Sequence, residues 1–270
     1  MEPFVWQENG ILRLKAWERA YPLVAGMTSR AHPDGGPEPF NLALHVGDDP
    51  QRVRARRDAL CEALGFPPEA FTCAEQVHGS RVVRVTPQDR GRGRLARETA
   101  FPATDGMHTD VPGVLLVAFF ADCVPLFFLD PIRRVIGLAH AGWRGTAQDV
   151  AGEMVRSLAT HYGTRPRDLR VAIGPSIGPC CYEVDERVAA ALRTTFGGEV
   201  PDGVLTANDE GRYWLDLRTA NQKLCERAGI LPENIEMTSV CTACATDRFF
   251  SHRAEKGRTG RMAAFVAWTG

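Results

Sequence analysis

Long apolar runs bounded by turn residues give the clearest structural signal in this chain. Two such runs cover residues 114–121 and 134–139, where nearly every side chain is apolar. A strand that is apolar at every position is typical of the centre of a sheet that is covered on both faces. Shorter runs predict three more strands, at 169–173, 235–241 and 262–268.

Other segments have the pattern of helices. The predicted helices span residues 49–64, 145–162, 185–196 and 217–228. In the second of them, apolar residues recur at three- and four-residue spacing from Val150 to Leu158, which places them on one face. The first helix is expected to begin at a capping Asp48 or Asp49 and to end at Gly65.

The N-terminal segment predicts a hairpin, with two strands between Phe4 and Trp17 that meet at Asn9–Gly10. Residues 31–39 and 87–102 are rich in glycine, proline or arginine, which predicts surface loops. Strands and helices mix along the chain without regular alternation. We therefore expect residues 1–270 to form a single α+β domain with mixed sheets and no internal linker.

The composition argues against a nucleic-acid-binding protein and against a membrane protein. The chain has 32 basic and 33 acidic residues, so nothing in its net charge favours binding to a nucleic acid. The longest apolar stretch, residues 111–129, is interrupted by Pro112, Asp122 and Pro125, which argues against a membrane span. Eight cysteines follow an N-terminus that does not resemble a signal peptide. We expect a cytoplasmic protein with reduced thiols.

Three short motifs carry the candidate chemistry. They are EQVHG at 75–79, ADCVP at 121–125 and HAGWRGT at 140–146, and each follows or ends a predicted strand. The motifs contain His78, Cys123 and His140. Two imidazoles and a thiolate suit zinc and leave a fourth position open for water or substrate. The spacing alone leaves open that these are three separate buried side chains.

Other metal sites fit the sequence less well. Seven histidines, without any His-x-His pair, are too few for the trinuclear cluster and blue-copper site of a conventional multicopper oxidase. Cys241 and Cys244 form one Cys-x-x-Cys, but the adjacent Cys180 and Cys181 are expected to point apart, so buried thiols are favoured over a second metal site. We therefore expect one zinc per chain, which a Cys244→Ala substitution should leave in place.

Two further kinds of chemistry stay open at this point. A Ser-His-Asp triad is not ruled out by the sequence. Cys123 and His140 would also serve as the nucleophile and base of a cysteine hydrolase that cleaves an amide. His45 and His108 lie near the motifs and are weaker candidates for ligand contact.

The motifs, taken together, resemble a known family. QVHG at 76–79, ADCVPLFF at 121–128 and HAGWRGT at 140–146 occur in the order found in laccase-like polyphenol oxidoreductases, which have been reassigned as purine nucleoside phosphorylases. Further matching segments lie at 28–50, 103–107, 172–184 and 241–263. The resemblance covers nearly the whole chain.

The resemblance implies a fold, a metal and an activity. The fold would be a layered α/β/β/α sandwich with mixed sheets, like the catalytic domain of cytotoxic necrotizing factor. His78, Cys123 and His140 would bind zinc, with copper as the alternative. The activity would be phosphorolysis of adenosine, inosine, guanosine and methylthioadenosine to free base and ribose 1-phosphate, with adenosine deamination as a second reaction. A copper-dependent polyphenol oxidase, or a hydrolase of peptidoglycan precursors, is the alternative.

Several residues are expected to serve this activity with purine nucleosides and phosphate. Cys123, His140 and Asp122 are the expected catalytic residues, with Asp122 the nearest carboxylate for proton transfer. The substrate-binding residues are expected to be Arg30, Asn41, Gln76 and Arg144, since guanidinium groups suit phosphate. Arg258 and Arg261 are second choices for the anion. His252 stands where relatives often have tyrosine, so the substrate preference would differ if this side chain contacts the base.

Overall fold

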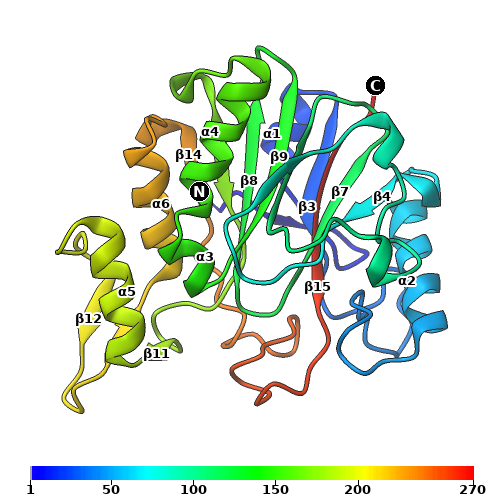
Figure 1. Cartoon of the computed structure of the whole chain (residues 1–270). Helices are drawn as coiled ribbons and strands as arrows, with labels where there is room; N and C mark the ends of the chain where they lie inside the picture. The colour runs from blue at the N-terminus through cyan, green and yellow to red at the C-terminus, as the bar shows by residue number, and fades with distance from the viewer. Residues whose placement is uncertain (1) are drawn as a thin grey trace.

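The computed structural model describes residues 2–270 and contains two six-stranded mixed sheets (Figure 1). The first has the order β1 (Val5–Trp6), β2 (Leu12–Arg13), β3 (Leu23–Met27), β15 (Met262–Trp268), β7 (Leu115–Phe120) and β4 (Phe71–Cys73). The second has the order β14 (Ile235–Met237), β10 (Arg170–Ile173), β8 (Val124–Asp130), β9 (Val135–Ala141), β6 (Gly106–Thr109) and β5 (Val82–Arg84). Neighbouring strands are antiparallel except at β4–β7, β5–β6 and β10–β14.

The two sheets pack against each other, and helices cover their outer faces. Strand β7 shows why its sequence is apolar throughout. Leu116, Ala118 and Phe120 point into the core between the sheets, whereas Leu115 and Val117 point into the outer core beneath α2 (Pro50–Ala63). A third core lies between the second sheet and the helices α4 (Val150–Tyr162) and α6 (Leu217–Arg227).

The layers therefore follow the order α/β/β/α, and the prediction of an α+β fold with mixed sheets is confirmed. The likeness to cytotoxic necrotizing factor stays a prediction. Two short helices, α1 (Lys15–Ala20) and α3 (Trp143–Ala147), complete the main body. Single 3₁₀ turns lie at residues 68–70, 87–89, 97–99, 166–168 and 232–234. In residues 2–270, no helix is long and apolar enough to cross a membrane.

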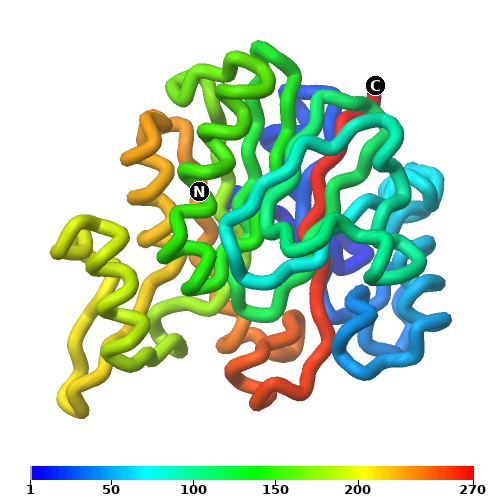
Figure 2. The backbone as a smooth tube through the Cα atoms, in the orientation of Figure 1, coloured from blue at the N-terminus to red at the C-terminus, as the bar shows by residue number. Residues whose placement is uncertain are grey.

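A smaller unit projects from one side of the main body, at the lower left of Figure 2. It consists of α5 (Glu186–Phe196) and a three-stranded antiparallel sheet in the order β11 (Glu183–Val184), β13 (Tyr213–Leu215) and β12 (Leu205–Ala207). These three strands are too short to give a clear pattern in the sequence. The segment 241–261 loops beneath the strand ends of both large sheets (Figure 2).

The structure confirms most of the predicted elements and corrects three of them. The helix expected over 145–162 is two helices, because Asp149 has a left-handed backbone (φ 57°) and its side chain caps α4 through the Gly152 amide. The N-terminal hairpin exists as β1 and β2, but Trp17 lies in helix α1 rather than in a strand. The strand expected over 235–241 ends at Met237.

Candidate active site

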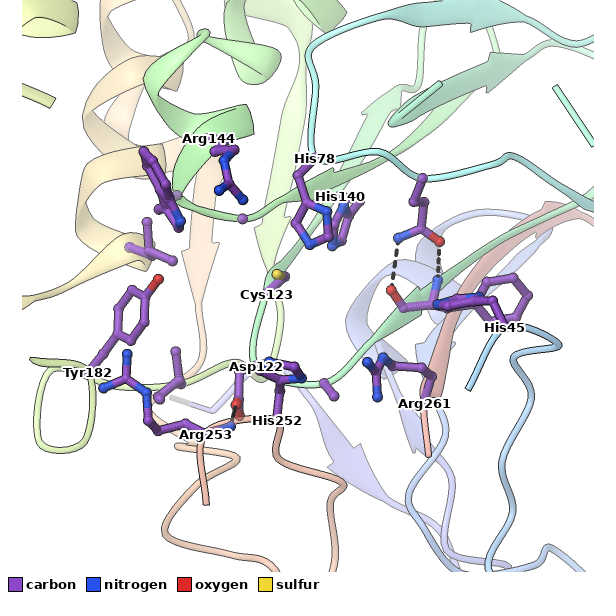
Figure 3. A pocket seen from close by; sticks show the side chains of 17 residues that line it. His45, His78, Asp122, Cys123, His140, Arg144, Tyr182, His252, Arg253 and Arg261 are labelled. Carbon is purple, nitrogen blue, oxygen red and sulfur yellow. Dashed lines mark hydrogen bonds between the residues drawn. The ribbon is translucent and has the colours of Figure 1, made fainter. Parts of the chain in front are cut away.

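The fold brings the three predicted metal ligands together at one end of the sheets (Figure 3). His78 lies in the loop after β4, Cys123 lies in the turn between β7 and β8, and His140 lies near the end of β9. Their ligand atoms all lie within 4.8 Å of one another. Because β8 and β9 pair with Pro125 opposite His140, the turn that holds Cys123 is adjacent to the imidazole.

Left-handed backbone conformations occur at His78 and at Asp122, the residue before Cys123, and they set the directions of the His78 and Cys123 side chains. His78 has φ 63° and Asp122, next to Cys123, has φ 86°. Left-handed conformations cost energy for residues other than glycine and are often found at functional sites. The carboxylate of Asp122 holds its strained turn in place, since it accepts hydrogen bonds from Thr242 Oγ1 (2.7 Å), Ser251 Oγ (3.0 Å) and the Arg253 amide (2.7 Å).

Asp105, directly before β6, connects two of the predicted ligands and was not identified from the sequence. Its carboxylate lies 2.9 Å from His140 Nδ1 and accepts from the amides of His78 (3.0 Å) and Gly79 (2.7 Å). With Nδ1 occupied in this way, Nε2 of His140 is left to face a metal, as in carboxylate–histidine–zinc arrangements. The motif ATDGM at 103–107 contained this residue, but nothing in its spacing pointed to His140.

Cys123 and His140 form a charged pair, and the Asp105 carboxylate orients the imidazole. Burial opposes ionisation of the Cys123 thiol, but interaction with His140 and then His78 outweighs it and lowers the pKa to about 6. Burial likewise opposes protonation of His140, but the Cys123 thiolate and Asp105 raise its pKa to about 9. The pKa of Asp105 is lowered, because its bonds to His140 and the amides outweigh its burial. A thiolate is the form that binds a metal.

We predict that Asp105→Asn lowers metal affinity by about ten- to a hundredfold, the usual effect of losing an outer partner of a histidine ligand. The amide can no longer stabilise the imidazole or accept from all the amides around it. Competition with a metal-chelating dye measures the affinity. Asp130→Asn is a matched control, since Asp130 is also fully buried and also accepts hydrogen bonds from Thr164 and backbone amides. Equal affinities in the two variants would contradict the role of Asp105.

The ligands open into a cavity of about 380 Å³. Three guanidinium groups line it, those of Arg144, Arg253 and Arg261 (Figure 3). The hydrogen bonds of Arg253 go to the Glu183 carbonyl, and those of Arg261 go to the carbonyls of 259 and 260. These bonds go to backbone carbonyls and not to carboxylates, so the cavity suits an anion.

The remaining wall combines aromatic and imidazole side chains. Tyr182 lies on the side of Arg144 and Arg253, and His45 lies on the side of Arg261 (Figure 3). Trp143, Phe119 and His252 also line the cavity. Desolvation and the nearby Arg261 lower the pKa of His45 to about 4, which leaves it neutral at pH 7. The cavity therefore offers flat apolar surface beside its cationic groups, as a nucleoside would require.

The structure separates the expected substrate-binding residues into two groups. Arg144 and Gln76 line the cavity, and the Gln76 amide pairs with both backbone groups of Phe119 at 2.7 and 2.8 Å. Arg30 and Asn41 lie outside it. Arg30 donates to the Thr246 carbonyl and forms an ion pair with Glu255.

Asn41 has a supporting position instead. Its side-chain oxygen accepts from the Arg261 amide at 3.0 Å, and its amide group donates to Asp48 at 3.0 Å. Asn41 therefore positions an arginine of the cavity wall. His108 is buried away from the cavity and bonds to Ser157 and Tyr162.

The structure also contradicts the expectation for the other cysteines. Cys180 and Cys181 do not point apart, and they meet Cys241 and Cys244 in one cluster with all sulfurs within 4.8 Å. Cys180 and Cys244 are exposed, so they are not buried thiols either. Consequently, Cys244→Ala is no longer a neutral control for metal content.

Comparisons with known proteins identify the family of this chain and agree with its fold. The chain belongs to the family of multi-copper polyphenol oxidoreductase laccases, whose family model matches residues 25–269. It is 47% identical over 253 residues to the purine nucleoside phosphorylase YlmD of Geobacillus stearothermophilus, covering 91% of this chain and 92% of that protein. It is 36% identical over 276 residues to the purine nucleoside phosphorylase YlmD of Bacillus subtilis, covering 98% and 96%.

Solved structures have the same fold. The crystal structure of YlmD from Geobacillus stearothermophilus matches with a TM-score of 0.93 and 43% identity over 100% of both chains. The hypothetical protein YfiH of Bacillus licheniformis matches with a TM-score of 0.91 and 38% identity over 99% of both chains. The family resemblance stated from the motifs is therefore confirmed.

Proposed function

We propose that this chain is a metal-dependent purine nucleoside phosphorylase, acting on adenosine, inosine, guanosine and methylthioadenosine. The observation that carries the proposal is that Arg144, Arg253 and Arg261 line the same cavity as the metal ligands. Phosphorolysis needs a dedicated anion site beside the sugar, whereas hydrolysis does not. Two relatives of this chain are named purine nucleoside phosphorylases.

In the proposed reaction, the arginines bind phosphate and the aromatic residues bind the base. A phosphate oxygen forms a bond to ribose C1′, the C1′–N9 bond breaks, and the departing base takes up a proton. The guanidinium groups would hold the phosphate in line with C1′ and stabilise its charge. Trp143 and Tyr182 line the cavity, and the purine would pack against one of these rings.

His78, Cys123 and His140 would hold the metal, and their donor set fits zinc better than the trinuclear site of a multicopper oxidase. A zinc ion would supply a Lewis acid and the activated water that adenosine deamination requires, and we propose deamination as the second activity. Asp122 was expected to transfer protons. Because it already accepts three hydrogen bonds, we propose that it positions Cys123 instead.

The test of the proposal is the identity of the products. Metal-loaded protein incubated with inosine and phosphate is expected to give hypoxanthine and ribose 1-phosphate, identified by mass, at a rate that saturates with phosphate. Deamination of adenosine consumes water and should continue without phosphate, which makes it an internal control. Free ribose appearing at the same rate in the absence of phosphate would contradict phosphorolysis.

A second candidate is a cysteine hydrolase that cleaves an amide. The observation in its favour is the sequence of contacts from Cys123 to His140 to Asp105, which resembles a nucleophile, its base and an orienting carboxylate. The position of His78 against the same sulfur favours the metal, since a hydrolase has no use for a second imidazole there.

Alkylation separates the two candidates. We predict that Cys123 in the metal-loaded protein resists iodoacetamide and reacts once the metal is stripped, because a bound thiolate is shielded. In the stripped protein, the rate should rise with pH around a midpoint near the pKa of Cys123, about 6, since only the thiolate reacts. An unperturbed thiol would have its midpoint near about 8.5. Rapid labelling and inactivation of the metal-loaded protein would favour the hydrolase.

A further inference from the structure

Two loops that are far apart in the sequence meet at a cluster of four cysteines. Cys180 and Cys181 lie in a turn between β10 and β11, and Cys241 and Cys244 follow β14. Sγ of Cys244 lies 3.5 Å from that of Cys180 and 3.3 Å from that of Cys181. The four sulfurs all lie within 4.8 Å of one another.

The turn explains how adjacent cysteines reach the same point. The carbonyl of Gly178 accepts from the amides of Cys181 and Tyr182, both at 3.1 Å, so the chain curls instead of extending. In an extended strand the two side chains would lie on opposite faces. The Gly178 amide in turn donates to Cys241 Sγ at 3.2 Å, which stabilises a thiolate. A Cβ at Gly178 would lie 3.3 Å from Cys241 Cβ and 3.4 Å from Cys180 Sγ, so a glycine leaves room for this approach.

We propose that Cys180, Cys181, Cys241 and Cys244 bind a structural zinc ion, separate from the metal centre of the cavity. Zinc–sulfur bonds of about 2.3 Å place the sulfurs of a tetrahedral site about 3.8 Å apart, close to the spacing observed. A disulfide would need two of the sulfurs at about 2.05 Å. The four sulfurs lie too close together to enclose an iron–sulfur cluster with its bridging sulfides. Four protein ligands close the site, which is typical of structural rather than catalytic zinc.

A buried cation lies beside the cluster and suits the charge of such a site. One zinc with four thiolates carries a net charge of −2. Arg218, which is 7% exposed, donates to the carbonyls of Thr238 and Val240 just before Cys241. Its Nη2 also approaches Gly178, within 3.0 Å of where a Cβ would lie. Arg218, whose Nε also lies 3.6 Å from an Asp216 carboxylate oxygen, therefore joins the two loops and offsets only part of the charge.

The site would fix the wall of the catalytic cavity. Next to the cysteines, the two loops are joined by the Thr242 amide, which donates to the Ser176 carbonyl at 3.0 Å, and Thr242 Oγ1 continues to Asp122. The same loops lead to Tyr182 and Arg253, whose guanidinium lies over the Tyr182 ring at 4.9 Å. A zinc at this point would keep both side chains at the cavity without taking part in the reaction.

Cysteine labelling of the unaltered protein tests the proposal. Iodoacetamide is applied to the native protein, and to protein denatured with a chelator but without a reductant, and labelled sites are found by peptide mass. Zinc binding predicts that the exposed Cys180 and Cys244 are protected in the native protein and fully labelled after denaturation. Labelling of these two in the native protein would overturn the proposal. So would failure to label them after denaturation, which indicates disulfides.

Zinc content tests it independently of the catalytic centre. In a Cys123→Ala background we expect one zinc per chain by elemental analysis, and none when Cys241 and Cys244 are also changed to serine. Cys225→Ala, at a buried cysteine outside both clusters, should leave the count unchanged. No zinc in the Cys123→Ala protein, or iron in its place, would overturn the assignment. Phosphorolysis by the unaltered protein would then still stand as a separate result.

Discussion

Replacing Cys123 by alanine is expected to remove the metal from the catalytic centre and to abolish phosphorolysis. The thiolate is the only anionic ligand of the three predicted at this centre, and its loss leaves two imidazoles, one of them exposed, to hold the ion. Loss of a catalytic metal removes several kcal/mol of transition-state stabilisation, roughly a thousandfold in rate.

Zinc content and the rate of inosine cleavage measure the two effects in the same preparation. The zinc content should fall by one atom per chain. Cys225→Ala is the control, because Cys225 is a buried cysteine outside both clusters. A Cys123→Ala protein that keeps its full zinc content and loses only activity would indicate a nucleophile rather than a ligand. Copper in place of zinc in the unaltered protein would favour the polyphenol oxidase alternative.

The main strands and the grouping of His78, Cys123 and His140 were predictable because their signals are local. Strand β7 is apolar at every position since one face packs between the sheets and the other beneath α2. Cys123 and His140 stand at the ends of such strands, where a polar residue lies on a rigid element that opens to solvent. Their meeting point then follows from the hairpin that β8 and β9 form.

The partners of these residues were not predictable, because they depend on pairing between distant segments. Asp105 meets His140 because β6 pairs with β9 and sets Gly106 opposite Ala139. Nothing in the motif ATDGM predicts that β6 pairs with β9. Arg253 and Tyr182 line the cavity from loops whose course no periodic pattern specifies.

The predictions for the cysteine cluster and for Arg30 were wrong for another reason. They relied on the residue type and not on the neighbouring residues in the fold. The two adjacent cysteines were expected to diverge, as they would in a strand, but the turn at Gly178 brings both to one point. Arg30 has the charge that phosphate needs, but it is already paired with Glu255 and stacked on Phe250 at 5.0 Å. Charge alone did not distinguish a binding arginine from a structural one.

Arg144 and Arg187 allow a direct test of which arginine binds phosphate. Both guanidinium groups stack on Trp143, at 4.6 and 5.5 Å from its ring, but only Arg144 lines the cavity. We expect Arg144→Ala to raise the phosphate concentration needed for half-maximal rate by about ten- to a hundredfold. This corresponds to about 1.5–3 kcal/mol for a lost charged contact. The requirement for inosine should change much less.

Steady-state rates at varied phosphate and fixed inosine, and the reverse, measure the two requirements separately. Arg187→Ala removes the same group from the same ring, so it reports any effect of disturbing Trp143 alone and should leave the phosphate requirement near that of the unaltered protein. Arg144→Lys should restore activity only in part, because a point charge cannot reproduce the bidentate contact of a guanidinium with phosphate. If Arg144→Ala and Arg187→Ala raise the phosphate requirement equally, Arg144 acts by supporting Trp143, and the phosphate site must be formed by Arg253 and Arg261.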